Sequence, residues 1–132
     1  MSNLKDTNQA SELFELCQKV YKLTNWKDTH SRLDDGNYTI RNEGNEVLLG
    51  SKQTPLYTSD YLLEKLPPVV QDSYDKKFRH IQMWINGDGE AIACYVEPYD
   101  KYFRGAYIAE SDSMLKALLK LTIALSEAGE LK

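Results

Sequence analysis

One segment near the middle of the chain constrains the fold more than any other, because it predicts a β-hairpin with two apolar faces. Residues 78–86 and 91–96 are rich in apolar side chains, and Gly87, Asp88 and Gly89 form a turn signal between them. The first strand carries Ile81, Met83 and Ile85 on one parity and Phe78, His80 and Trp84 on the other. Successive side chains of a strand point to opposite faces. We therefore expect something to cover this sheet on each side.

The rest of the chain supplies elements that could form these covers. We expect a helix over about 11–23, a loop over 24–37 with Trp26 turned inward, a hairpin of 38–41 and 46–49, a short helix entered from residues 58–60 and ended by Pro67 and Pro68, a third strand over 102–109, and a long helix over about 112–128. The sheet core then spans about 78–109. The predicted fold is α+β, a three-layer α/β/α sandwich, in one domain of 132 residues.

Composition narrows the class of protein. The net charge of -4 disfavours a broad electrostatic grip on nucleic acid. The N-terminus has no basic start followed by an apolar stretch, and no window is apolar enough to span a bilayer. We therefore expect a cytosolic protein that does not enter a membrane. Cys17 and Cys94 lie in apolar segments without ligand spacing, so we expect reduced thiols in the core.

Four short segments form a recognisable pattern: residues 57–60 entering a helix, the strand that holds Trp84, residues 107–111 leading into 117–121, and residues 23–26, where Trp26 follows the first helix. Together they resemble the phage ABA-sandwich domain family. The resemblance covers about Leu13 to Leu125. It implies a sheet between helical layers, a phage or prophage origin and expression inside a bacterium. It implies no catalytic residues.

No pattern of polar residues fixes a reaction. His30 lies near Asp28, Asp34 and Asp35, but these residues lack the spacing of a metal-binding loop. His80 sits in a strand without any hydrolase, metal or phosphate-loop motif around it. We expect no metal, no cofactor and no catalytic residue, although an enzyme that uses His80 with a nearby carboxylate stays open as an alternative.

The strongest candidate for a binding site is the turn before the third strand. It combines aromatic and cationic side chains, the types enriched in binding hot spots. Its members are Tyr99, Lys101, Tyr102, Phe103 and Arg104, and we add Arg79 from the basic cluster 76–80. That cluster mixes cations and aromatics as single-strand binders do, but it is small on an acidic chain, so nucleic acid is disfavoured as a partner.

These observations lead to three hypotheses from different classes. The first is a phage or prophage accessory protein that binds a host protein, as an anti-defence or regulatory inhibitor, in the host cytosol. The second is a small-molecule sponge for a nucleotide signal, with Arg79, Lys101 or Arg104 on phosphate and tyrosines on the base. The third is the enzyme that uses His80. A homodimer stays open, and the sequence identifies neither the partner nor the ligand.

Overall fold

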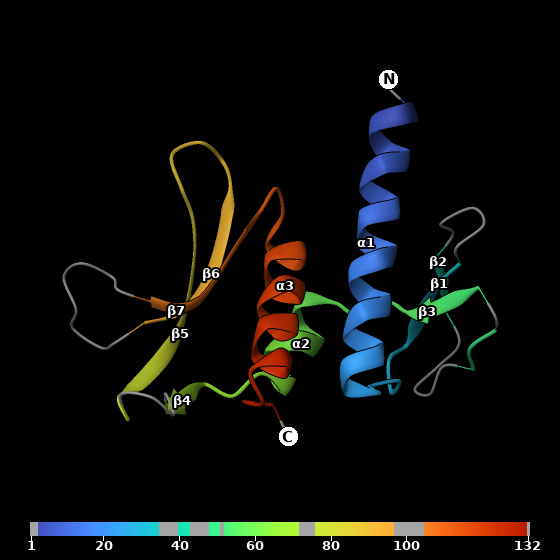
Figure 1. The fold of residues 1–132 in the computed structure, drawn as a ribbon. Coiled ribbons are helices and arrows are strands. Elements are labelled where there is room, and N and C mark those ends of the chain that lie inside the picture. Colours follow the sequence, from blue (N-terminus) through green and yellow to red (C-terminus); the bar gives the residue numbers. More distant parts are fainter. Residues whose placement is uncertain are drawn as a thin grey trace. The chain divides into compact units, whose positions relative to one another are not determined.

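The computed structural model describes residues 3–34, 40–42, 48–50, 52–71, 76–96 and 105–131 (Figure 1). The chain divides into two compact units, Met1–Tyr61 and Leu62–Lys132. Each unit has its own antiparallel sheet and its own long helix. The predicted α+β class is confirmed, and one difference from the prediction is that the described residues form two sheets where one was expected.

Helix α1 (Asn3–Thr24) begins the first unit and contains the helix expected over 11–23. Phe14, Cys17 and Val20 are buried at three-residue steps, so one face of the helix enters the core. Asn25 follows the end of the helix and has a left-handed backbone with φ of 59°. Its N–H donates to the carbonyl of Tyr21 at 2.7 Å. Asparagine tolerates this conformation at a helix end better than most residues do.

Three short strands form the first sheet, in the order β2 (Ile40–Asn42), β1 (Ser31–Asp34) and β3 (Gln53–Pro55). Helix α1 packs against β3. Leu33 and Thr54 lie opposite each other in the β1–β3 register and are both buried. The sheet therefore places one apolar and one hydroxyl side chain side by side in the core.

This sheet corrects one prediction and leaves another untested. The loop expected over 24–37 contains β1, because pairing to two distant strands gives residues 31–34 an extended backbone. The hairpin expected between 38–41 and 46–49 lies partly outside the described residues and stays a prediction; of its described part, Ile40 and Arg41 pair with β1, where Ile40 lies opposite Leu33. Residues 35–39 and 43–47, which include the predicted turns, lie outside the described residues.

Three aromatic side chains, Trp26, Tyr57 and Tyr61, pack together near the end of α1. The side chain of Tyr57 is buried, and its hydroxyl donates to the carbonyl of Trp26 at 2.5 Å. Trp26 is half-buried and meets Tyr61 edge to face, with 6.3 Å between ring centroids. Edge-to-face contact is a favourable arrangement of aromatic rings, and a buried tyrosine hydroxyl usually has a hydrogen-bond partner. The segment that follows α1 is thereby tied to the start of α2 (Ser59–Lys65).

The second unit contains a four-stranded antiparallel sheet in the order β4 (Val69–Gln71), β5 (Phe78–Ile85), β6 (Ala91–Val96) and β7 (Gly105–Ser111). The predicted central hairpin is confirmed. Its register runs from His80 opposite Val96 to Ile85 opposite Ala91. Strand β4 is not among the strands that the sequence predicts: the short helix was expected to end at Pro67 and Pro68, with a kinked helical continuation through Val69 and Val70 as the alternative. Without N–H groups, Pro67 and Pro68 disfavour that continuation.

Helix α3 (Met114–Glu127) is the long C-terminal helix that the sequence predicts. The hydroxyl of Ser113 caps its start by accepting the N–H of Lys116 at 3.2 Å. Gly129 follows its end with φ of 77°, a conformation that glycine adopts without strain. The helix packs on β6 and β7 with Leu118, Leu121 and Leu125 buried. In the part of the chain that the structure describes, no helix is long and apolar enough to cross a membrane.

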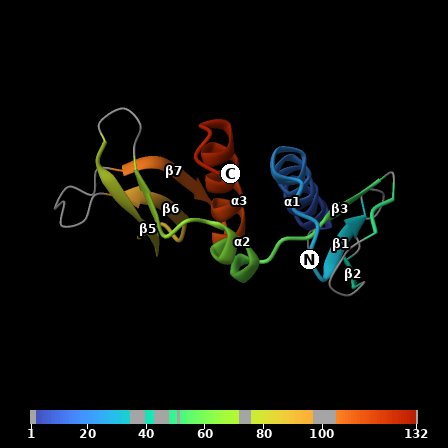
Figure 2. The same ribbon diagram turned by 90° about the horizontal axis from the view of Figure 1, so that it is seen from below.

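The helical layer of this unit covers one face of its sheet. Figures 1 and 2 both show α2 and α3 on that side of β5, β6 and β7. The register places the buried residues Ala93, Ala109 and Ser111 on the face under α3. The described residues of this unit form no helix over the opposite face, which we call the outer face. The second helical layer expected over the sheet is therefore not found within this unit.

Candidate functional site

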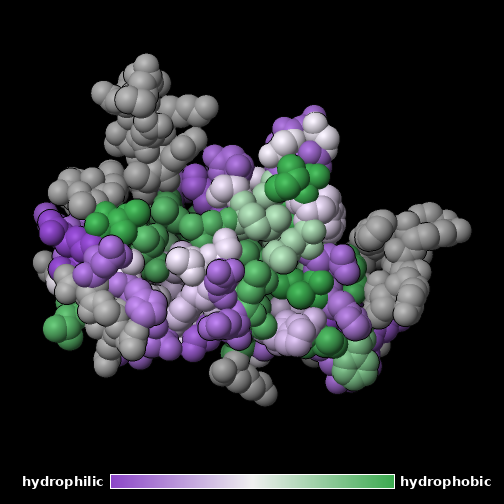
Figure 3. All heavy atoms as spheres, turned by 180° about the vertical axis from the view of Figure 1, so that it is seen from behind, coloured by the Kyte–Doolittle hydropathy of each residue, from purple (hydrophilic) through white to green (hydrophobic). Residues whose placement is uncertain are grey.

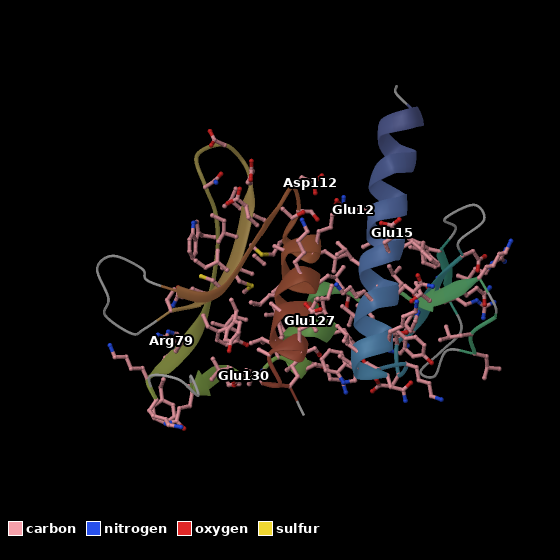
Figure 4. All side chains as sticks on the ribbon, in the orientation of Figure 1. Glu12, Glu15, Arg79, Asp112, Glu127 and Glu130 are labelled. Carbon is pink, nitrogen blue, oxygen red and sulfur yellow. The ribbon has the colours of Figure 1, made fainter. Side chains whose placement is uncertain are left out.

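Five of the six predicted binding residues lie outside the described residues. They are Tyr99, Lys101, Tyr102, Phe103 and Arg104. The sixth, Arg79, is half-buried near the start of β5, and Figure 4 labels it. It lies opposite the buried Val70 of β4, so it belongs to the face under the helices. The predicted site, and the nucleotide-sponge alternative that uses its cations, both stay predictions.

The surroundings of His80 bear on the enzyme alternative. Its side chain is exposed on the outer face, and its cross-strand neighbours are Val69 on β4 and Val96 on β6. A general base needs a group that orients it or exchanges a proton with it. The two cross-strand positions hold apolar side chains, so the sheet itself gives His80 no such group there.

Both cysteines are free and buried, as the sequence predicts. Burial raises the pKa of the Cys17 thiol to about 12. Burial also raises the pKa of Cys94 above its ordinary value. The reactive form of cysteine is the thiolate. Both residues therefore act as small apolar core groups in their units.

Two carboxyl groups meet near the turn of the β5–β6 hairpin. Glu110 of β7 and Glu90 share a hydrogen bond, which raises the pKa of Glu110 together with the negative charges of Glu90 and Asp88. Glu110 is exposed and lies opposite Ile92 on the outer face. Within the described ranges, no group of three or more His, Cys, Asp or Glu residues could hold a metal ion.

The outer face carries a set of exposed apolar side chains on three strands. Phe78 is 58% exposed and Ile108 is 62% exposed, and Val69 and Trp84 are also exposed. The register places Val69 beside His80 and Trp84 beside Ile92, on the side opposite the buried Ala93. In Figure 3, apolar atoms reach the surface over the part of the chain that carries this sheet. We call Val69, Phe78, Trp84 and Ile108 the outer-face cluster.

The hairpin end of β5 exposes apolar side chains on the other face as well. Met83 is 40% exposed and Ile85 is 59% exposed, although both share the face of the buried Ala91 and Ala93. The cause is the position of α3, which packs on β6 and β7. Strand β5 therefore presents apolar side chains in both directions over its last three residues.

Among the described residues, no strand pairs with the same end of β5 on the side away from β6, and we call this the open edge. Strand β4 pairs with Phe78, Arg79 and His80, and the N–H of Ile81 donates to the carbonyl of Pro68 at 3.2 Å. Pro68 has no N–H to return, so the β4 ladder stops there. Backbone groups alternate in direction along an antiparallel strand. The N–H and C=O groups of Met83 and Ile85 therefore point to the same side as the N–H of Ile81, past the end of β4.

The opposite edge of the sheet, on β7, differs from the β5 edge. The β6–β7 register shifts between Ala93 and Tyr95, which is a β-bulge. Tyr107 has a left-handed backbone there, with φ of 58°. A bulge twists an edge strand away from a regular partner, and natural proteins use it to protect sheet edges. Strand β5 has no charge, proline or bulge from Ile81 to Ile85.

Comparisons with family models, curated proteins and solved structures find no match to this chain. The resemblance to the phage ABA-sandwich domain family therefore stays a prediction.

Sequence reasoning missed the outer-face cluster, although the signal was present. Apolar side chains on both parities of residues 78–85 were interpreted as a strand covered by helices of the same chain. The pattern is equally typical of a strand with one face left for a partner. The predicted third strand over 102–109 includes Ile108. Its face does not follow from simple alternation, because the β-bulge changes which residues of the strand share a side.

Proposed function

We propose that this chain is a non-catalytic binding protein that engages a partner protein through the outer-face cluster. The observation that carries the proposal is the exposure of Phe78 and Ile108, which are more than half accessible on one sheet face. Single exposed apolar residues are ordinary on protein surfaces, but a group of them on one face is typical of an interaction site.

The energetics support a protein surface as the partner. Burying a large apolar side chain contributes about 1.5 to 3 kcal/mol. Phe78 and Ile108 are more than half exposed and would gain most of this energy in an interface, whereas Val69 and Trp84 are little more than one third exposed and would gain correspondingly less. Between Phe78 and Trp84 on β5 lie His80 and Gln82, which carry hydrogen-bonding groups and no fixed charge. The centre of an interface is similarly poor in charged residues.

The carboxyl pair defines the chemistry expected at the rim. Glu110 lies on the outer face, and its pKa is raised by the hydrogen bond and the charge of Glu90. A partner that brings a lysine or arginine to this position would relieve the repulsion between the two carboxylates. We therefore propose a partner with an apolar patch that is flanked by a basic side chain.

The biological setting of the proposal comes from the resemblance described above. On that basis we propose a phage or prophage accessory protein, acting in the bacterial cytosol on a host defence or regulatory protein. This part is tested separately, by measuring whether expression of the chain changes the plating of phage on a defended strain. Binding through the outer-face cluster without any such change would retain the binding module and reject the anti-defence role.

The binding surface is tested with purified partner and point variants. The partner is first captured from host lysate in the presence of nuclease, and its affinity is then measured by calorimetry. We expect Phe78→Ala and Ile108→Ala each to weaken binding at least tenfold, which corresponds to about 1.4 kcal/mol. The matched control is Leu48→Ala, because Leu48 is an apolar residue of the first unit that is 79% exposed.

Two outcomes would contradict the assignment. Equal affinity for all variants would remove the outer-face cluster from the interface. Loss of binding with Tyr102→Ala or Arg104→Ala alone would move the interface to the turn that the sequence predicts.

A further inference from the structure

We propose that the open edge of β5 pairs with the same edge of a second copy of this chain, forming a symmetric dimer with one continuous eight-stranded sheet. The inference goes beyond the proposed function, because it uses the backbone edge of β5 and needs no partner protein. It rests on the observation that two copies of this edge are compatible with each other in their hydrogen-bonding groups, their side chains and their charge.

The backbone atoms of the edge allow self-pairing. The N–H of Ile81 points toward β4 and the N–H of Asn86 donates to Glu90 on the β6 side at 2.9 Å. Because backbone groups alternate in direction along the strand, the N–H and C=O groups of Met83 and Ile85 point toward the open edge. Two identical antiparallel strands are related by a two-fold axis perpendicular to the sheet, which keeps the same face of both copies on one side.

One register satisfies all of these groups. If the axis passes beside Trp84, Met83 of each copy lies opposite Ile85 of the second copy. Each such pair exchanges two hydrogen bonds, so four bonds use every N–H and C=O of both residues in both copies. A register centred on Met83 would place Ile85 of the second copy opposite Ile81, whose N–H already donates to Pro68, so that only the two bonds between the Met83 residues would form. The geometry therefore favours the axis at Trp84.

The side chains agree with this register. Trp84 of each copy meets Trp84 of the second copy in a non-hydrogen-bonded pair on the outer face, the closer of the two kinds of antiparallel pair. Aromatic pairs at such positions stabilise a sheet. On the other face, Met83 meets Ile85 of the second copy, so the exposed apolar side chains of the hairpin end cover one another. These residues are 40% and 59% exposed in the single chain.

Charge at the edge itself does not oppose a second copy as the occupant. Residues 81–85 contain no charged side chain, so self-pairing brings no like charges opposite each other at the edge. The whole chain carries a net charge of -4, so two copies repel at long range. Three paired residues per strand form a small contact, typical of reversible association. The dimer should therefore form at high concentration and become stronger with added salt.

The dimer also has a consequence for the outer face. Because the axis is perpendicular to the sheet, both outer-face clusters lie on the same side of the continuous sheet. The dimer would therefore present two binding surfaces side by side, and a partner with two matching sites would gain affinity from bivalency.

The test combines sedimentation with a register-specific cross-link, both on the purified full chain without any partner. Sedimentation velocity from low micromolar to near-millimolar concentration should show a monomer–dimer equilibrium that shifts toward dimer in salt. Met83→Pro should abolish the dimer, because it removes an N–H that the β5–β6 ladder does not use. Met83→Ala is its control, because it keeps that N–H and should still dimerise.

Cysteine substitution tests the register. Trp84→Cys should form an intermolecular disulfide on treatment with diamide, because the axis brings the two positions within disulfide range. Gln82→Cys, on the same strand and face, should not, because it does not face itself across the axis. Both variants also carry Cys94→Ala, because Cys94 lies directly opposite Gln82 on β6 and would form an intramolecular disulfide with the new thiol. Cys17 is buried and should not contribute. Circular dichroism confirms that each variant is folded.

Three results would overturn the proposal. They are a wild-type chain that stays monomeric over the whole concentration range, a dimer that Met83→Pro does not weaken, and cross-linking of Gln82→Cys that is as fast as that of Trp84→Cys. Because no partner protein is present, none of these results bears on binding through the outer-face cluster.

Discussion

The phenol of Tyr95 donates a hydrogen bond of 2.7 Å to the carbonyl of Pro67. Tyr95 is fully buried on β6, whereas Pro67 lies between α2 and β4. Burial raises the pKa of the Tyr95 phenol far above its ordinary value, so the group stays protonated and remains a donor. This bond ties the segment that leads into β4 to the centre of the sheet.

Removing the hydroxyl should destabilise the second unit without changing its fold. We expect Tyr95→Phe to lower the free energy of unfolding by about 1 kcal/mol, since one hydrogen bond is lost and a carbonyl loses its partner. Urea denaturation followed by circular dichroism measures the change. Tyr61→Phe is the control, because its hydroxyl contacts Asp28 at the surface and should matter less. Equal effects of both substitutions would show that the Tyr95 bond has no special role.

Local signals explain which parts of the fold were predictable. The β5–β6 hairpin follows from alternating apolar residues around Gly87 and Gly89, and α3 follows from Ser113 and an apolar face at helical spacing. The first sheet was missed because its strands have three or four residues each. Their extended backbone comes from pairing between distant segments, which a local pattern does not encode.

The candidate surface was less predictable than the fold for a different reason. Periodicity shows that Phe78 and Trp84 share a face, but it does not show whether that face is covered. Coverage depends on where α3 packs, and α3 lies on β6 and β7. The open edge depends on where β4 stops, which Pro68 decides through its missing N–H.

Acid should weaken the first unit through Asp34. A hydrogen bond from Arg41, a second from Gln53 and the charges of Arg41 and Arg32 hold the pKa of Asp34 below its ordinary value of 3.8. A lowered pKa stabilises the fold above the unfolded value and loses that contribution as the pH falls through the folded value. We expect stability to decline below about pH 3.8. Chemical denaturation at a series of pH values measures this.

The Asp34 contribution can be isolated with two variants. Asp34→Asn should lower stability at pH 7 and flatten the decline in acid. Arg41→Gln should have a smaller effect in the same direction, because Gln53 still donates to Asp34. An unchanged acid profile in Asp34→Asn would assign the decline to other carboxyl groups.

The two cysteines can report separately on the two units, because Cys17 lies in the first and Cys94 in the second. Burial raises the pKa of Cys17 to about 12, so its thiol stays protonated at pH 8. We expect neither thiol to react with a disulfide reagent in the folded chain. In rising urea, labelling of each thiol measures the opening of its own unit.

The labelling experiment also tests the single-domain prediction. The variants Cys17→Ala and Cys94→Ala leave one thiol each, so the two reactions can be followed alone. Coincident urea dependence would indicate one cooperative domain. Separate transitions would indicate two domains, and rapid labelling of Cys17 without urea would contradict its burial.

Removing one negative charge from the pair formed by Glu110 and Glu90 should stabilise the second unit. The hydrogen bond with Glu90 and the negative charges of Glu90 and Asp88 raise the pKa of Glu110 above 4.5. A raised acid pKa favours the fold below the unfolded value, and this contribution is lost as the pH rises through the folded value. At neutral pH the two carboxylates therefore repel each other.

We expect Glu110→Gln to raise the unfolding midpoint at pH 7 and to change it little at pH 4 or below. Glu127→Gln is the control in α3, and an equal gain from it would show that net charge alone is responsible. If the partner brings a basic side chain to this rim, the same Glu110→Gln substitution should weaken its binding, so stability and affinity would change in opposite directions.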